Sequence, residues 1–190
     1  MHLRRLLFGA LLYFVFWSQL AAQSLNAHID RDQLHVSAPR FHFLINRALD
    51  RLRDGATVRF EFQLTARPDK IGRVFARSQE IFAISYDLWE EKFAITKLGS
   101  SPRTVSHLSP AAAEAWCIEN TTLPLSVLSV QPFWLRLEYR AEEPSSGDQP
   151  DNSGFTLSGL IDIFSRRTRG EQLHGSEEIG PISLEKLRKK

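Results

Sequence analysis

Cysteine is nearly absent from this sequence, which has one thiol, Cys117, among 190 residues. A single cysteine permits no disulfide within the chain. It also excludes a zinc site closed by several thiolates, because such a site needs more than one sulfur. We expect Cys117, beside Trp116 in an alanine-rich stretch, to be a small buried side chain and not a nucleophile. The fold must then depend on packing.

The sequence also lacks the short motifs of common enzyme classes. It has no Gly-x-Ser-x-Gly nucleophile elbow, no His-Glu-x-x-His helix, no phosphate-binding Gly-x-x-x-x-Gly-Lys and no dinucleotide-binding Gly-x-Gly-x-x-Gly. Ser106 and His107 are adjacent, and we do not expect chain neighbours to form a nucleophile–base pair, which tertiary structure normally assembles. We therefore predict no catalytic residues and no cofactor.

Charge of one sign is not in excess either. The chain has 24 Lys and Arg against 22 Asp and Glu, a formal net charge of +2. Binding to nucleic acid generally needs a concentrated basic surface, so we expect no nucleic-acid partner. The basic residues near the C-terminus are interspersed with glutamates, and a polar, solvated tail is the simpler interpretation.

Long apolar runs are confined to the start of the chain. Arg4 and Arg5 precede twelve apolar residues, 6–17, and a tail of small and weakly polar residues ends near Gln23. This is the pattern of a secretory signal peptide, which we assign to residues 1–23. The alternative is an uncleaved anchor, but a spanning helix needs about 20 apolar residues. We expect an exported protein with no transmembrane segment in the mature chain.

Residues 24–190 are predicted to form a single β-rich domain, with a mobile loop at 142–154 and a polar C-terminal tail. Alternating apolar residues predict strands, and apolar residues at helical spacing predict short helices. The strands follow one another without the strand–helix alternation of a parallel sheet. The expected strands are 26–30, 34–38, 57–65, 74–89, 92–98, 123–130 and 133–141, with an edge strand near 180–184; the expected helices are 41–52, 110–119 and 157–164. We predict a mainly β fold, an antiparallel β-sandwich or curved sheet of six to seven strands with two or three short packed helices.

Two pairings are specific enough to test. If His28 faces His35, the apolar neighbours of both histidines share the opposite face of the hairpin. In the hairpin around Glu90-Glu91, the expected register places Leu88 opposite Phe93 and Tyr86 opposite Ile95.

The order of elements resembles a known family. The segments that carry the likeness are 49–55 (Leu-Asp-Arg-Leu-Arg-Asp-Gly), the strand 58–64, the hairpin 86–95 and the helix after Ser109. Together they resemble the domain of unknown function 4390 family, a group of uncharacterised exported bacterial proteins. The resemblance implies a periplasmic, cell-envelope location. It implies no catalytic residue, because the family has no agreed activity.

The candidate binding residues are Trp89, Trp134 and Arg136. Both tryptophans lie opposite the main apolar positions of their strands, and Trp134 shares its face with Arg136. Exposed Trp and Arg are enriched at interaction hot spots. The alternative is that a helix, such as 157–164, covers the two tryptophans.

A metal site is the less favoured possibility. His28 and His35, if opposed on one face, have the donor chemistry for zinc or copper, with Asp30 or Asp32 supplying oxygen. Two solvated strand histidines are the simpler interpretation. The leading functional hypothesis is a non-enzymatic binding or interaction module for an envelope protein or envelope component. The alternatives are an exported hydrolase with an unrecognised, possibly metal-dependent site, and an apolar small-molecule carrier.

Overall fold

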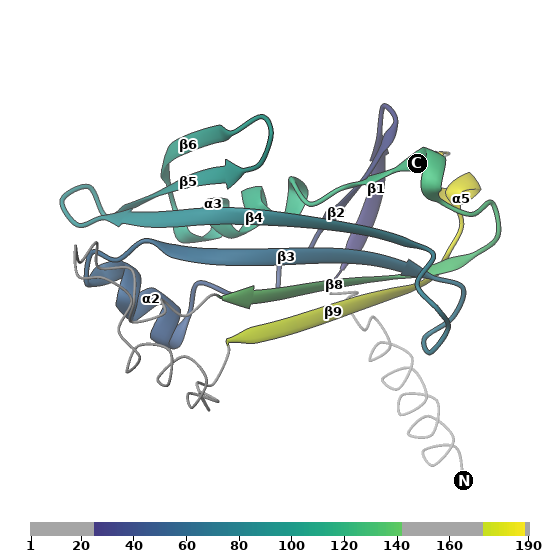
Figure 1. Cartoon of the computed structure of the whole chain (residues 1–190), viewed down its shortest axis with the longest axis horizontal. Helices are drawn as coiled ribbons and strands as arrows, with labels where there is room; N and C mark the ends of the chain where they lie inside the picture. Colours follow the sequence, from purple (N-terminus) through teal and green to yellow (C-terminus); the bar gives the residue numbers. More distant parts are fainter. Residues whose placement is uncertain (1–24, 142–172, 189–190) are drawn as a thin grey trace, which may run out of the picture.

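The computed structural model describes residues 25–141 and 173–188. These residues form two antiparallel sheets that pack together with three short α-helices (Figure 1). The six-stranded sheet has the order β6-β5-β4-β3-β8-β9, and the three-stranded sheet has the order β1-β2-β7. The predicted mainly β, antiparallel fold class is confirmed. The predicted signal peptide 1–23, loop 142–154 and helix 157–164 lie outside the described residues.

Most neighbouring strands are consecutive in the chain, but β7 pairs with β2 and β8 pairs with β3. In chain order they are β1 Asn26–Asp30, β2 Gln33–Ser37, α2 Asn46–Arg53, β3 Val58–Arg67, β4 Ala76–Asp87, β5 Lys92–Leu98, β6 Arg103–Leu108, α3 Pro110–Glu119, β7 Leu123–Pro124, the 3-10 turn η2 Leu125–Val127, β8 Phe133–Ala141, β9 His174–Ile182 and α5 Leu184–Arg188. No helix within the described residues is long and apolar enough to cross a membrane.

The centre of the large sheet is β3, which pairs with β4 on one side and β8 on the other. Its alternate residues Val58, Phe60, Phe62 and Leu64 are fully buried, as the period-two pattern predicts. Strand β8 matches its predicted bounds, 133–141, and buries Leu135 and its alternate neighbours on the same side. One face of the sheet is therefore the core face, and the other carries polar side chains.

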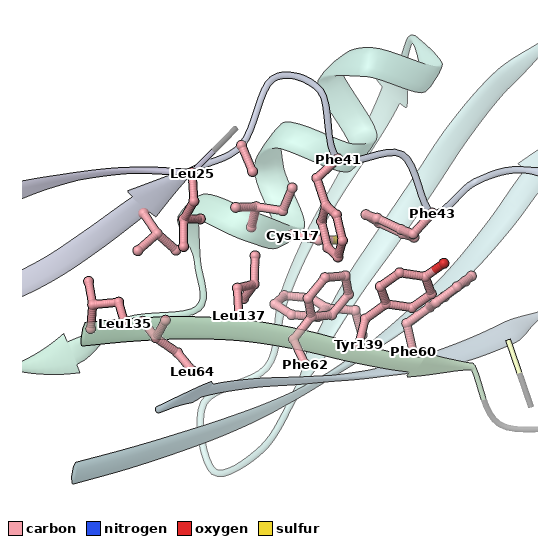
Figure 2. Close-up of a cluster of buried hydrophobic side chains, with 14 of the residues drawn as sticks. Leu25, Phe41, Phe43, Phe60, Phe62, Leu64, Cys117, Leu135, Leu137 and Tyr139 are labelled. Atoms are coloured by element: carbon pink, nitrogen blue, oxygen red, sulfur yellow. The ribbon is translucent and has the colours of Figure 1, made fainter. Parts of the chain in front are cut away.

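The core lies between this face and a second layer made by α3, the β1–β2 hairpin and the segment before α2 (Figure 2). Phe43 contacts the rings of Phe60 and Phe62, both at centroid distances of 4.9 Å and edge-on. Such edge-to-face contacts add to the free energy gained from burial alone. In the described part of the chain, every buried polar side-chain atom has a hydrogen-bond partner.

The first predicted helix is shorter than its apolar stripe. Phe41 and Leu44 are buried, but α2 begins only at Asn46, and Ile45 occupies the N-cap position in an extended conformation. The expectation that this helix begins at Phe41 is therefore wrong. The amides of Phe43 and Leu44 both donate to Glu114, which holds this segment extended. Periodicity alone could not reveal that contact.

The hairpin register is shifted by two residues from the prediction. Tyr86 faces Phe93 and Asp87 faces Lys92, so four residues, 88–91, form the turn. The carboxylate of Asp87 accepts hydrogen bonds from the turn amides and ends the strand there. Strand β4 pairs with β3 in an unbroken register.

Three segments differ from their predicted structure. Residues Arg103–Leu108, which are in none of the expected strands, form β6, which has little apolar alternation because it lies at the sheet edge. The predicted strand 123–130 is only the two-residue β7 followed by η2. In the expected polar C-terminal tail, where only an edge strand near 180–184 is predicted, residues His174–Ile182 form β9 along the opposite sheet edge. It contains the cis Gly180–Pro181 bond.

Candidate functional site

The β4–β5 hairpin ends in a tip, residues 88–91, that exposes a tryptophan. Trp89 is 95% exposed and Leu88 is 57% exposed. Asp87 Oδ1 accepts hydrogen bonds from the backbone N–H of Trp89, at 2.8 Å, and of Glu90, at 3.0 Å. Glu91 closes the turn with a φ of 53°. The tip is thus an ordered turn that presents a large apolar side chain to solvent.

The surroundings of this tip are acidic. Asp87, Glu90 and Glu91 lie within five residues of one another, and Lys92 opposes them at the start of β5. The pKa of Asp87 is lowered, first by the hydrogen bond from the Glu90 amide, then by that from Trp89. The Asp87 carboxylate therefore stays ionised at neutral pH and keeps the turn closed.

Trp134 and Arg136 lie on the polar face of the large sheet, as the alternation predicts. Trp134 is half-buried: a Cβ at Gly180 would lie 2.6 Å from its ring, so the β9 backbone packs against it. The Lys70 ammonium lies 4.7 Å from the ring centroid. Arg136 Nη2 forms a 2.8 Å ion pair with Glu138 Oε1. Both candidate side chains already have partners within the chain.

The structure does not bring the two tryptophans together. Trp134 pairs with Arg67 at the end of β3, beside the β3–β4 turn. Trp89 follows the far end of β4, at the β4–β5 turn. These turns lie at opposite ends of the long strands (Figure 1). The three predicted binding residues therefore form two separate surfaces: the tip with Trp89, and the sheet face with Trp134 and Arg136.

The histidine pair has the predicted register, with His28 opposite His35. Their rings are stacked, with centroids 5.4 Å apart and planes 21° from parallel. Nitrogen lone pairs lie in the ring planes, so nearly parallel rings direct them alongside each other and not toward a common point. The Nδ1 of His35 also lies 2.9 Å from the carbonyl of Glu119. Among the described residues, no three His, Cys, Asp or Glu side chains are grouped to hold a metal ion.

Glu114 is a buried carboxylate that the sequence analysis did not identify. It is 7% exposed on α3. Its Oε1 accepts from the amides of Phe43, at 2.8 Å, and Leu44, at 2.9 Å, and its Oε2 accepts from His42 Nδ1 at 2.7 Å. A signal was present, since Glu114 is the one acidic residue in the apolar body of a helix that buries Cys117 three positions later.

Burial in this core also sets the chemistry of Cys117. Desolvation raises the pKa of its thiol well above the usual value, and the charge of Glu114 raises it further. The same two causes, in the same order, raise the pKa of Tyr139. A buried thiol of raised pKa is inert as a nucleophile. Cys117 is free and buried, as expected.

Comparisons with family models, with curated proteins and with solved structures gave no significant match to this chain.

Proposed function

We propose that this protein is a binding module, exported to the periplasm of a bacterium, and that the tip is its main contact with an envelope protein or another envelope component. The observation that carries the proposal is the 95% exposure of Trp89 on a turn held by the Asp87 carboxylate. An isolated apolar residue on a surface is ordinary, but an ordered, fully presented tryptophan is the residue type most enriched at hot spots.

The free energy that this contact can supply is estimated from the area of the Trp89 side chain. Burying a tryptophan removes about 150–250 Å² from water, which corresponds to about 4–6 kcal/mol at 25 cal/mol per Å². Association itself costs a comparable free energy. Because the Asp87 hydrogen bonds already order the turn, little further conformational entropy is lost on binding. The tip can anchor a complex, but a stable one needs additional contacts.

The acidic side chains around Trp89 indicate what the partner surface should be. Asp87, Glu90 and Glu91 would be repelled by an anionic surface and attracted by a basic rim. A partner with an apolar pocket bordered by Lys or Arg is therefore favoured. Export is supported by the signal-peptide pattern of residues 1–23, and the periplasm by the resemblance to exported bacterial proteins.

The test is photo-crosslinking in living bacteria with a photoreactive amino acid at position 89. The matched control carries it at position 130, because Val130 is also an apolar loop residue, 89% exposed. We expect a specific adduct from position 89 that excess unlabelled protein suppresses and excess Trp89→Ala protein does not. Equal adducts from both positions, or equal suppression by both competitors, would contradict the proposal. Trp89→Ala should leave the free energy of unfolding unchanged within about 0.5 kcal/mol, since the side chain contacts solvent.

A further inference from the structure

A β-bulge near the end of β6 brings two neighbouring side chains into contact. Phe93 pairs with Leu108 and Ile95 pairs with Val105, so two residues of β6, Ser106 and His107, oppose one residue of β5. His107 has a φ of 61°, which a non-glycine residue adopts only at some cost. On a regular strand these neighbours would point to opposite faces. The bulge instead places Ser106 Oγ 2.9 Å from His107 Nδ1.

The other ring nitrogen of His107 reaches the tip. His107 Nε2 lies 3.1 Å from Glu90 Oε2. One assignment of protons satisfies both contacts with a neutral ring: Ser106 donates its hydroxyl proton to Nδ1, and Nε2–H donates to the Glu90 carboxylate. Serine, imidazole and carboxylate then stand in the order found in serine hydrolases, with the two ring nitrogens exchanged. Bulges and strained backbone of this kind are found beside active sites.

We propose that Ser106 is a nucleophile for acyl transfer, with His107 as its general base and Glu90 as a positioning residue. Ser106 Oγ attacks the carbonyl carbon of an ester while its proton passes to His107 Nδ1. The tetrahedral intermediate collapses, the carbon–oxygen bond to the leaving group breaks, and the departing alkoxide takes the proton from His107. Water then attacks the acyl-serine with the same base, which releases the carboxylic acid and restores Ser106.

The surroundings define the class of substrate. The side chains of His107 and Glu90 are 70% and 53% exposed, so the site is open to acyl groups presented at a surface. Leu88 and Trp89 adjoin Glu90 in the tip and favour an apolar acyl or aromatic group. An open site does not exclude water, and so covalent labelling is a better readout than turnover. This activity goes beyond the proposed binding function and does not depend on it.

The first experiment measures labelling of the exported protein by a fluorophosphonate, whose phosphorus the serine oxygen attacks with loss of fluoride. Peptide mass spectrometry identifies the modified serine. We expect Ser106 to be modified, Ser106→Ala to abolish the adduct, and Ser101→Ala, at an exposed serine outside the bulge, to leave it unchanged. Labelling of Ser106 no faster than that of Ser101 would overturn the proposal.

The role of the imidazole is tested by His107→Asn. Asparagine tolerates positive φ, so this variant keeps the bulge while removing the base. General-base catalysis contributes about 10²–10⁴-fold, and we expect labelling of Ser106 to slow at least about 100-fold with the thermal midpoint little changed. An unchanged rate would show that Ser106 is an ordinary hydroxyl. If this variant unfolds, His107→Gln is the second substitution, and a folded His107→Gln with wild-type labelling is equally negative.

The positioning role of Glu90 is tested by its effect on the ring. In the wild type, ¹⁵N NMR should show the neutral His107 ring protonated at Nε2. Glu90→Ala should give a mixture of tautomers and slower labelling, whereas Glu119→Ala, at an exposed acid outside the tip, should change neither. An identical tautomer signal in Glu90→Ala would remove Glu90 from the proposed site.

Discussion

Substituting Glu114 by alanine tests the contact that holds the segment before α2 against α3. The substitution leaves the amides of Phe43 and Leu44 without the carboxylate oxygen they share, in a region where both residues are buried. A hydrogen bond to a charged group contributes about 1.5–3 kcal/mol. The two bonds together contribute about 3–6 kcal/mol, and partial relaxation of the segment leaves an expected loss of about 3–5 kcal/mol. The bond from His42 adds little, because the imidazole is 56% exposed and can turn to water.

This loss is a large fraction of the 5–15 kcal/mol that stabilises an ordinary domain. The assay is equilibrium unfolding in urea, followed by circular dichroism. With a urea dependence of about 2 kcal/mol per M, the midpoint should fall by about 1.5–2.5 M. The matched control is Glu119→Ala, which removes an exposed acid from the end of the same helix. It should move the midpoint by less than about 0.3 M.

Two further variants separate the contributions within this contact. Glu114→Gln keeps an oxygen for the two amides and should lose only about 1–2 kcal/mol. His42→Ala should lose less than about 1 kcal/mol. If Glu114→Ala cost no more than His42→Ala, the two amides would have found other partners and the argument from buried hydrogen bonds would be refuted.

Three other perturbations follow from named contacts. Gly175→Ala places a Cβ 2.6 Å from the Tyr139 ring, so the thermal midpoint should fall by several degrees, and an unchanged midpoint would contradict the close approach of β9 to that ring. Cys117 is buried and the pKa of its thiol is raised, so it should react with a thiol reagent only after unfolding, and rapid reaction in the native protein would disprove its burial. The free energy of unfolding should also decline as the pH rises past the ordinary thiol value of 9.0, because the thiol then loses its proton in the unfolded chain first. The pKa of Asp87 is lowered in the folded chain, so its contribution to the stability of the turn is present above the ordinary value of 3.8 and is lost as the pH falls through the lower, folded value. In that acidic range, the NMR signals of the Trp89 and Glu90 amides should move together. Signals that do not titrate would exclude the carboxylate as the acceptor of these two amides.

The sequence predicts this fold best where one strand face is wholly buried. Strand β8 alternates throughout and β3 alternates up to Leu64, and both have the predicted core faces. The β1–β2 hairpin was likewise predictable, because the pairing of His28 with His35 places the apolar residues on one side. The cap and first turn of α3, Ser109 and Pro110, also follow from local chemistry.

The errors have a common origin in contacts between distant segments. Phe41 and Leu44 have helical spacing, yet Glu114, about 70 positions later in the chain, holds the segment extended. The tip register depends on a side chain, Asp87, whose acceptance of turn hydrogen bonds ends β4 early. Strand β6 lies at an edge and buries little, so no apolar pattern marks it. Neither Glu114 nor the contact of Ser106 with His107 could be inferred from periodicity.

The candidate binding residue Trp89 lies in a turn, where core packing does not determine the type of side chain. Three large apolar side chains of the described residues are more than four-fifths exposed: Ile71 at 96%, Trp89 at 95% and Val130 at 89%. All three lie in turns, where no core contact specifies an apolar residue. The amide of Ile71 donates a hydrogen bond to the Asp69 carboxylate, as the amide of Trp89 does to Asp87. An ordered turn alone therefore does not distinguish the turn of Ile71 from that of Trp89. The difference lies in what surrounds them. Ile71 follows Lys70, whose ammonium is occupied by the Trp134 ring, whereas Trp89 is followed by Glu90, which contacts His107 on a bulged strand. Of these two turns, only the one at residues 88–91 joins a large apolar side chain to polar groups arranged by backbone strain. We therefore place both the proposed binding contact and the proposed acyl-transfer chemistry at residues 88–91 and the adjoining bulge.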